Sequence, residues 1–189
     1  MKKTVLTFGL IGGAIMAAMM FATLPFADRI GFDKGAIIGY TTMILAFMLV
    51  FFGIRSYREN VSGGQITFGR AFAVGILITL VACVCYVVAW EILYFKFMPD
   101  FVDKYSSYVI EKARTSGASQ QVIDAQLQQM KSLKAMLDNP FINAAITFTE
   151  PLPIGLIVTL ISAAILRKKT IAATRDEGRP TQLQVQEEN

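Results

Sequence analysis

Residues 147–155 read TFTEPLPIG, and they lie inside an apolar run that extends from Phe141 to Leu166. A helix of about 20 apolar residues crosses a lipid bilayer, so this run is long enough to span a membrane. Glu150 and the two prolines after it are costly in such a segment, because a carboxylate resists transfer into hydrocarbon and proline removes a helix hydrogen bond. The stretch therefore predicts a membrane span that carries a polar residue, Glu150, within its apolar run.

Three further apolar runs precede it. They cover residues 4–26, 36–54 and 72–95, and together with 141–166 they predict four transmembrane helices. The chain of 189 residues is 54% hydrophobic and 17% charged, and its charges gather at the ends of the runs and in the breaks between them. Backbone groups in lipid must bond within their own segment, which favours helices. We predict an all-α polytopic membrane protein in which residues 1–169 form a single four-span domain.

The first run also has features of a secretory signal, since Lys2 and Lys3 precede it. It is longer than the usual signal core of about 7–15 residues. The candidate cleavage point is after Ala27, and Pro25 occupies the nearby position at which a signal peptidase requires a small residue. We therefore expect the run to be retained as a membrane span.

Basic residues near the span ends predict the orientation, because lysine and arginine concentrate on the cytoplasmic side. On one side lie Lys2, Lys3, Arg55, Arg58, Arg70, Arg167, Lys168 and Lys169. This distribution predicts that both termini are cytoplasmic and that residues 98–140 form an external insert. Residues 170–189 lack an apolar period and are expected to be a disordered cytoplasmic tail.

The external insert shows helical periodicity on both sides of TSGAS, residues 115–119. Its two apolar stripes are Phe101, Val102, Tyr105, Tyr108 and Val109, and then Ile123, Leu127, Met130, Leu133 and Leu137. We predict an amphipathic helical hairpin between the third and fourth spans. Its apolar faces would pack on each other, lie on the membrane surface or receive a partner, and mutual packing is the simplest of the three.

Small residues recur every four positions in two places. The two sets are Gly9, Gly13 and Ala17 in the first span, and Gly31, Gly35 and Gly39 at the start of the second. Small residues at this spacing let membrane helices approach closely. We expect both sets to serve packing within the bundle, with a homodimer face as the alternative.

The break between the second and third spans carries the sequences RSYREN, residues 55–60, and GGQITFGRAFAVG, residues 63–75. With four spans and an insert before the last one, residues 1–169 resemble the bacterial membrane family catalogued as domain of unknown function 4199. The resemblance implies the four-span topology and a place in the bacterial cytoplasmic (inner) membrane. It implies no activity, substrate or cofactor.

Three arginines of this break, Arg55, Arg58 and Arg70, are candidates for contact with a lipid phosphate or a protein partner. The simpler interpretation is that they anchor the topology, since any cytoplasmic loop of a membrane protein carries such charges.

A second candidate site is a polar cleft near the outer end of the bundle, formed by Glu91, Asn143, Thr147 and Glu150. The last three follow helical spacing and share one face of the fourth span. Glu91 lies near the outer end of the third span. We expect these groups to converge in a cleft that is open to the exterior.

Two interpretations of Glu150 remain open. In the structural one, Lys96 or Arg29 pairs with it and holds the carboxylate at the interface. In the functional one, Glu150 and Glu91 accept a cation, a proton or a small amine.

The composition argues against catalysis. The chain has no histidine, and Cys83 and Cys85 point to different helix faces, so no metal site, cofactor or disulfide is expected. The net charge of +4 reflects topology rather than nucleic-acid binding. We predict a non-enzymatic scaffold or accessory subunit, with a small-solute or cation carrier as the alternative. The expected partners are the lipid bilayer and either another membrane protein or further copies of the chain.

Overall fold

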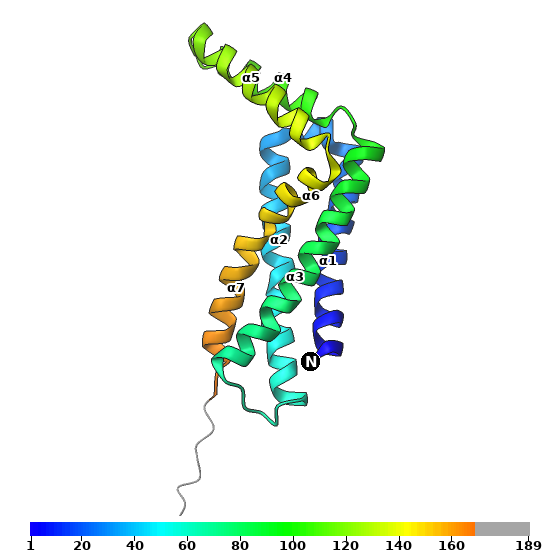
Figure 1. The fold of residues 1–189 in the computed structure, drawn as a ribbon, viewed down its shortest axis with the longest axis vertical. Helices are drawn as coiled ribbons and strands as arrows, with labels where there is room; N and C mark the ends of the chain where they lie inside the picture. Colours follow the sequence, from blue (N-terminus) through cyan, green and yellow to red (C-terminus); the bar gives the residue numbers. More distant parts are fainter. Residues whose placement is uncertain (169–189) are drawn as a thin grey trace, which may run out of the picture.

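The computed structural model describes residues 1–168, apart from the side chain of Asp28. Long helices form an elongated bundle, and two further helices project from one of its ends (Figure 1). The helices are α1 (Lys2–Thr23), η1 (Leu24–Phe26), α2 (Ala27–Asn60), α3 (Phe68–Ile92), η2 (Leu93–Phe97), α4 (Phe101–Thr115), α5 (Gln120–Leu137), α6 (Pro140–Thr149) and α7 (Pro151–Leu166). The predicted tail, residues 170–189, lies outside the described residues.

Four helical segments are long and apolar enough to cross a membrane. They are Lys2–Phe26, Arg29–Asn60, Phe68–Phe97 and Pro140–Leu166, and each contains one of the predicted apolar runs. The prediction of an all-α, four-span membrane protein is therefore confirmed. Each span extends a few residues beyond one or both of its predicted ends, because helix continues into the polar residues that flank the apolar run.

The bundle is packed most tightly around α3, which contacts α1, α2 and α7. A Cβ added at Gly9 would lie 2.7 Å from the Val81 Cβ, and one added at Gly13 would collide with Cys85. These two glycines of α1 therefore let it approach α3 within the chain, as the small-residue pattern predicted. Large side chains such as Phe47 fill the rest of this core.

The helix α2 bends near its start, at Gly31. This residue has φ 72° and ψ 166°, a backbone conformation that favours glycine. The bend carries Phe32 toward α4, where its ring packs on Phe101, Tyr105 and Tyr108. The junction between the first two spans thereby holds the insert against the bundle.

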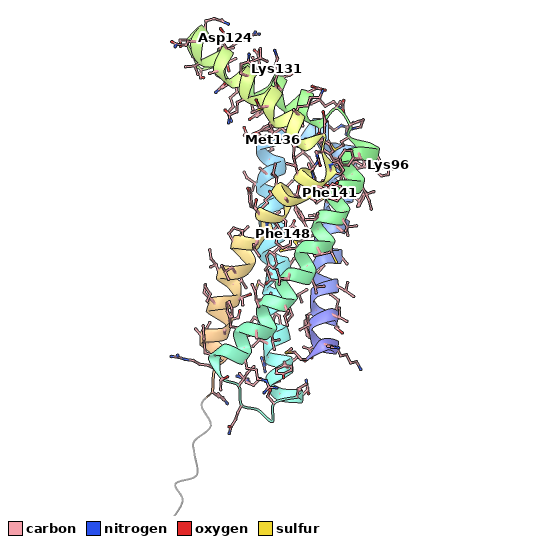
Figure 2. All side chains as sticks on the ribbon, viewed as in Figure 1. Lys96, Asp124, Lys131, Met136, Phe141 and Phe148 are labelled. Carbon is pink, nitrogen blue, oxygen red and sulfur yellow. The ribbon has the colours of Figure 1, made fainter. Side chains whose placement is uncertain are left out.

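The insert is a helical hairpin of α4 and α5, which we call the arm; it leaves the bundle at the end opposite the N-terminus (Figure 1). Figure 2 shows Asp124 and Lys131 on the part of the arm that projects away from the bundle, and Lys96 at the arm end of the third span. The two helices contact each other, which agrees with the predicted mutual packing.

The apolar stripe of α5 is buried at Ile123, Met130 and Leu137, whereas Leu127 is 39% exposed. An ion pair between Lys134 and Asp103, with Nζ 2.6 Å from Oδ2, joins α5 to α4. This hydrogen-bonded carboxylate raises the pKa of Lys134 above its usual value. The arm is thus held by a partly buried stripe and by exposed charge pairs.

Candidate ligand-binding cavity

The sequence TFTEPLPIG breaks the fourth span into α6 and α7. Pro151 and Pro153 have no amide hydrogen to continue the helix ladder. The Thr149 hydroxyl donates to the Ile146 carbonyl at 2.6 Å instead, and the Glu150 amide donates to the Thr147 carbonyl. The break places the Glu150 side chain at the junction of two helices.

Asn143, on α6, is the centre of a buried polar chain and is fully inaccessible to solvent. Its Oδ1 accepts hydrogen bonds from the Trp90 Nε1 at 3.0 Å and from the Thr147 hydroxyl at 3.2 Å. Its Nδ2 donates to the Leu137 carbonyl at 3.0 Å. Asn143 therefore connects α6 to α3 and to the end of α5, and its side chain is occupied by these contacts.

Glu150 accepts a hydrogen bond from the Tyr86 hydroxyl, with 2.9 Å between the oxygens. The partner comes from the third span, but it is Tyr86 rather than Glu91, Lys96 or Arg29. Tyr86 and Trp90 are four residues apart on α3 and share the face toward α6, whereas Glu91 is rotated by about 100° from Trp90.

No hydrogen bond joins Glu91 to Asn143, Thr147 or Glu150 among the described residues. One of the Glu91 carboxylate oxygens is buried without a hydrogen-bond partner in the described part of the chain. The structure brings Asn143, Thr147 and Glu150 together along one face, and the polar group it adds from α3 is Tyr86.

A cavity of about 1070 Å³ lies beside Glu150, between the arm-side halves of the spans and beneath the arm. Its described lining is mostly apolar and comes from α1, η1, α2, α3, η2, α4, α5 and α6. The lining includes five methionines and seven aromatic residues: Met16, Met19, Met20, Met43, Met98, Phe32, Tyr40, Tyr86, Trp90, Phe101, Tyr105 and Tyr108. Glu150 is the only carboxylate among the described lining residues, and its side chain is exposed.

Part of the cavity wall is made by Gly31, Gly35 and Gly39 of α2. An added Cβ at Gly31 or Gly39 would meet no atom within 4 Å. The prediction that this second glycine set packs against another helix is therefore wrong. These residues leave space instead, and that space is the cavity.

Between Glu150 and the end of the bundle opposite the arm, the helices are closely packed. The hydroxyls of Thr79 and Thr159 are 3.1 Å apart, and Thr79 also bonds to the Gly155 carbonyl. Phe47 and Ile78 are almost completely buried at this level. In the described residues, the polar groups here satisfy one another and the cavity is closed toward the opposite end.

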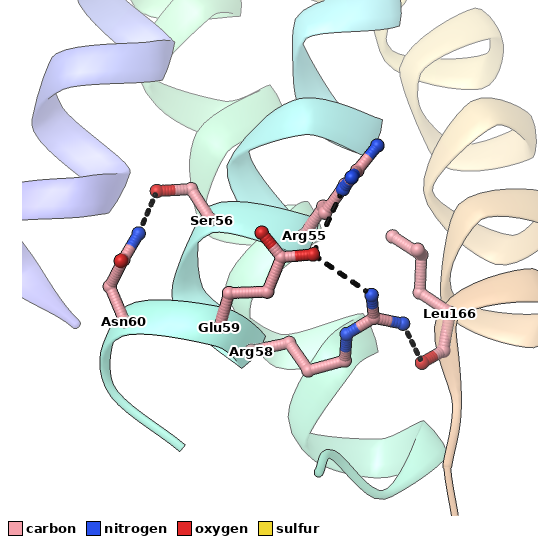
Figure 3. A network of polar contacts seen from close by, with 6 residues as sticks. All are labelled: Arg55, Ser56, Arg58, Glu59, Asn60 and Leu166. Atoms are coloured by element: carbon pink, nitrogen blue, oxygen red, sulfur yellow. Dashed lines mark hydrogen bonds and ion pairs between the residues drawn. The ribbon is translucent and has the colours of Figure 1, made fainter. Parts of the chain in front are cut away.

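The arginines of the second break lie at that opposite end and bond within the chain (Figure 3). The Arg58 guanidinium contacts Glu59 at 3.2 Å and donates to the Leu166 carbonyl at 3.3 Å. Arg55 bonds to the same glutamate, and Arg70 donates to a buried tyrosine hydroxyl of α2. Arg58 is largely buried and caps the end of α7, while the Arg55 side chain remains 54% exposed.

The sequence did not point to Tyr86, which contributes the hydroxyl that contacts Glu150. The available signal was its position one helix turn before Trp90 in an otherwise apolar run. When tyrosine and tryptophan are buried, the tyrosine hydroxyl and the indole N–H usually form hydrogen bonds. Tyr86 and Trp90 together therefore indicated a polar face on α3.

A model of one protein family, described as a protein of unknown function (DUF4199), matches residues 7–168. No curated protein and no solved structure matches the chain. The matched region contains nearly all of the four spans and the whole arm. The chain is an integral membrane protein and belongs to the DUF4199 family.

Proposed function

We propose that this protein binds a positively charged ligand in the cavity through Glu150, and that it does so without catalysis. The observation that carries the proposal is an exposed carboxylate in a membrane span, at the wall of a cavity of about 1070 Å³. A carboxylate in a span is expensive to maintain, and such residues usually mark a ligand or ion site. The cavity volume is slightly above the usual range for small-molecule sites, which is about 300–1,000 Å³.

We further propose that the arm end faces the exterior and that both termini are cytoplasmic. The basic residues at the N-terminus, in the 55–70 region and after α7 support this orientation, because they lie together at the other end of the bundle. The ligand would then enter from the outer leaflet or the external solution. The resemblance to a bacterial family favours the cytoplasmic membrane as the location.

A non-enzymatic role is supported by the composition. The sequence has no histidine, and residues 1–168 contain no group of three side chains suited to holding a metal ion. The contact of Thr79 with Thr159 closes the bundle beyond Glu150, which favours binding over conduction. A sensing or accessory subunit fits this arrangement better than a carrier does.

The proposal can be tested by thermal unfolding of the purified protein with increasing concentrations of ethylammonium chloride. A ligand that binds the folded state stabilises it by about 2.7 kcal/mol at 100 times its Kd, so the melting temperature should rise by several degrees. Glu150→Gln should remove this rise, since the amide retains the bond to Tyr86 but has no charge.

Glu91→Gln is the matched control, because Glu91 is a carboxylate of the adjacent span that does not line the cavity. It should respond to ethylammonium as the wild type does. Sodium chloride at equal concentration controls for ionic strength. An equal response of all three proteins to ethylammonium would contradict the proposed role of Glu150.

A further inference from the structure

We propose that the ligand is a long apolar molecule with a single basic amine, and that it enters sideways from the lipid between α2 and α6. This inference rests on the proposed function and assigns the chemical class of the ligand. It depends on the lining of the cavity, on its opening and on the position of Glu150.

The lining is suited to an apolar body rather than to a hydrated ion. Four methionines, Met16, Met19, Met20 and Met43, line the cavity from α1 and α2. Methionine is flexible and polarizable, so such a wall adapts to apolar ligands of varied shape. An inorganic cation needs several oxygen ligands, whereas Glu150 is the only carboxylate in the described lining.

The amine would lie close to Glu150 and the aromatic rings beside it. Tyr86 and Trp90 line the same part of the cavity. A single ammonium requires one carboxylate to balance its charge, and aromatic faces add cation–π attraction. One carboxylate on the wall thus matches one ammonium on the ligand, and the lysine of the lining, Lys104, is paired with Asp100 at 3.1 Å.

The proposed mouth between α2 and α6 is inferred from the helix contacts and from the exposed lining residues. The helix α2 packs against α1, α3 and α7, and α6 packs against α3, α5 and α7, but α2 and α6 make little contact with each other. Tyr40 on α2 and Ile146 on α6 line the cavity and are 48% and 39% exposed, so they flank its mouth. Gly35 and Gly39 widen the α2 side of this mouth because they carry no side chain.

The depth of Glu150 favours entry from lipid. The helix α6 is 10 residues long, so Glu150 lies about 15 Å from its start, within the apolar part of the span. A small hydrated cation would lose its water to reach this depth, at a high cost in free energy. An amine attached to an apolar body recovers part of that cost by burying the body against the methionine wall.

The experiment uses Trp90 as a reporter, because it is the single tryptophan of the chain and it lines the cavity. The full-length protein is placed in lipid nanodiscs, and Trp90 fluorescence is quenched with a bromine-labelled long-chain alkyl ammonium. A bromine-labelled alcohol of equal chain length controls for partition into the lipid. The ammonium should reach half-maximal quenching at a concentration at least about tenfold lower than the alcohol.

Two variants locate the site. Glu150→Gln should make the ammonium and the alcohol quench at similar concentrations. Gly39→Leu should abolish the preferential quenching, since Gly39 lines the cavity and a Cβ added there meets no atom within 4 Å. Gly69→Leu is the matched control, because Gly69 is also unobstructed but lies in the first turn of α3, away from the cavity.

Three results would overturn this inference. Equal quenching by the ammonium and the alcohol in the wild type would mean that the cavity accepts lipid chains regardless of charge. Preferential quenching that survives Gly39→Leu would place the ligand elsewhere. Glu150-dependent stabilisation by ethylammonium, with no gain in affinity from a longer alkyl chain, would reject the apolar body while leaving the proposed function intact.

Discussion

Replacing Asn143 with alanine should destabilise the fold strongly, because this side chain joins three elements. Its amide bonds to the Trp90 indole, to the Thr147 hydroxyl and to the Leu137 carbonyl, at 3.0–3.2 Å. All three bonds would be lost in Asn143→Ala. The arm-side end of α6 would then be held only by the apolar contacts of its neighbours.

The magnitude follows from the number of groups left without a partner. Hydrogen bonds between membrane helices contribute about 0.6 kcal/mol each on average, so three account for about 2 kcal/mol. Asn143 is fully buried, and buried groups that lose a partner cost more, at about 1–3 kcal/mol each. We expect Asn143→Ala to lower the free energy of unfolding by about 2–4 kcal/mol.

The assay is reversible unfolding in mixed micelles, with increasing sodium dodecyl sulfate and helix content followed by circular dichroism. This signal does not depend on Trp90, which the substitution itself perturbs. Asn60→Ala is the matched control, since the Asn60 amide makes one exposed bond to Ser56 at 3.2 Å. It should change stability by less than about 0.5 kcal/mol. A similar loss in both variants would refute the role assigned to the Asn143 network.

Three further predictions concern packing, the arm and the orientation. Gly155→Ala should destabilise the bundle by about 1–3 kcal/mol in the same unfolding assay, because the new Cβ would collide with the Thr79 side chain and lie 3.0 Å from a buried phenylalanine ring. Leu133→Asp should speed proteolysis of the arm more than Leu127→Asp does, since Leu127 is 39% exposed and Leu133 packs on a buried cluster; equal rates would mean that the two positions are equally buried. In intact cells, a chain whose native cysteines are replaced by alanine should react with an impermeant thiol reagent at Ser116→Cys and not at Gln65→Cys; the reverse pattern would invert the proposed orientation.

The four spans could be predicted from the sequence because one physical requirement decides them. An apolar segment of the right length must satisfy its backbone internally, and helix is the way to do so. The arm was predictable for a similar reason, since its stripes recur at helical spacing between polar residues. Both features depend on local periodicity, which a single sequence contains.

The composition of the site depends on how the helices are rotated and bent, and local periodicity does not fix this. Glu91 and Tyr86 are both near the same end of α3, but only Tyr86 is on the face toward α6. Glycine spacing likewise does not predict where helices pack, because a small residue permits close packing without requiring it. A Cβ added at Gly9 would meet Val81, whereas one added at Gly39 would meet no atom within 4 Å.

Glu150 lies where α6 ends and α7 begins, and its surroundings at this junction determine how far the carboxylate is stabilised. Glu150 is both the C-cap of α6 and the N-cap of α7, so the negative end of one helix dipole and the positive end of the next oppose each other at its carboxylate. Proline is suited to the first position of α7, because its missing amide hydrogen would have no partner there. The Tyr86 hydroxyl adds one donor at 2.9 Å. One hydroxyl stabilises a carboxylate only in part, so the carboxylate retains an attraction for a cation on the side that faces the cavity. The junction therefore leaves Glu150 able to bind an ammonium group.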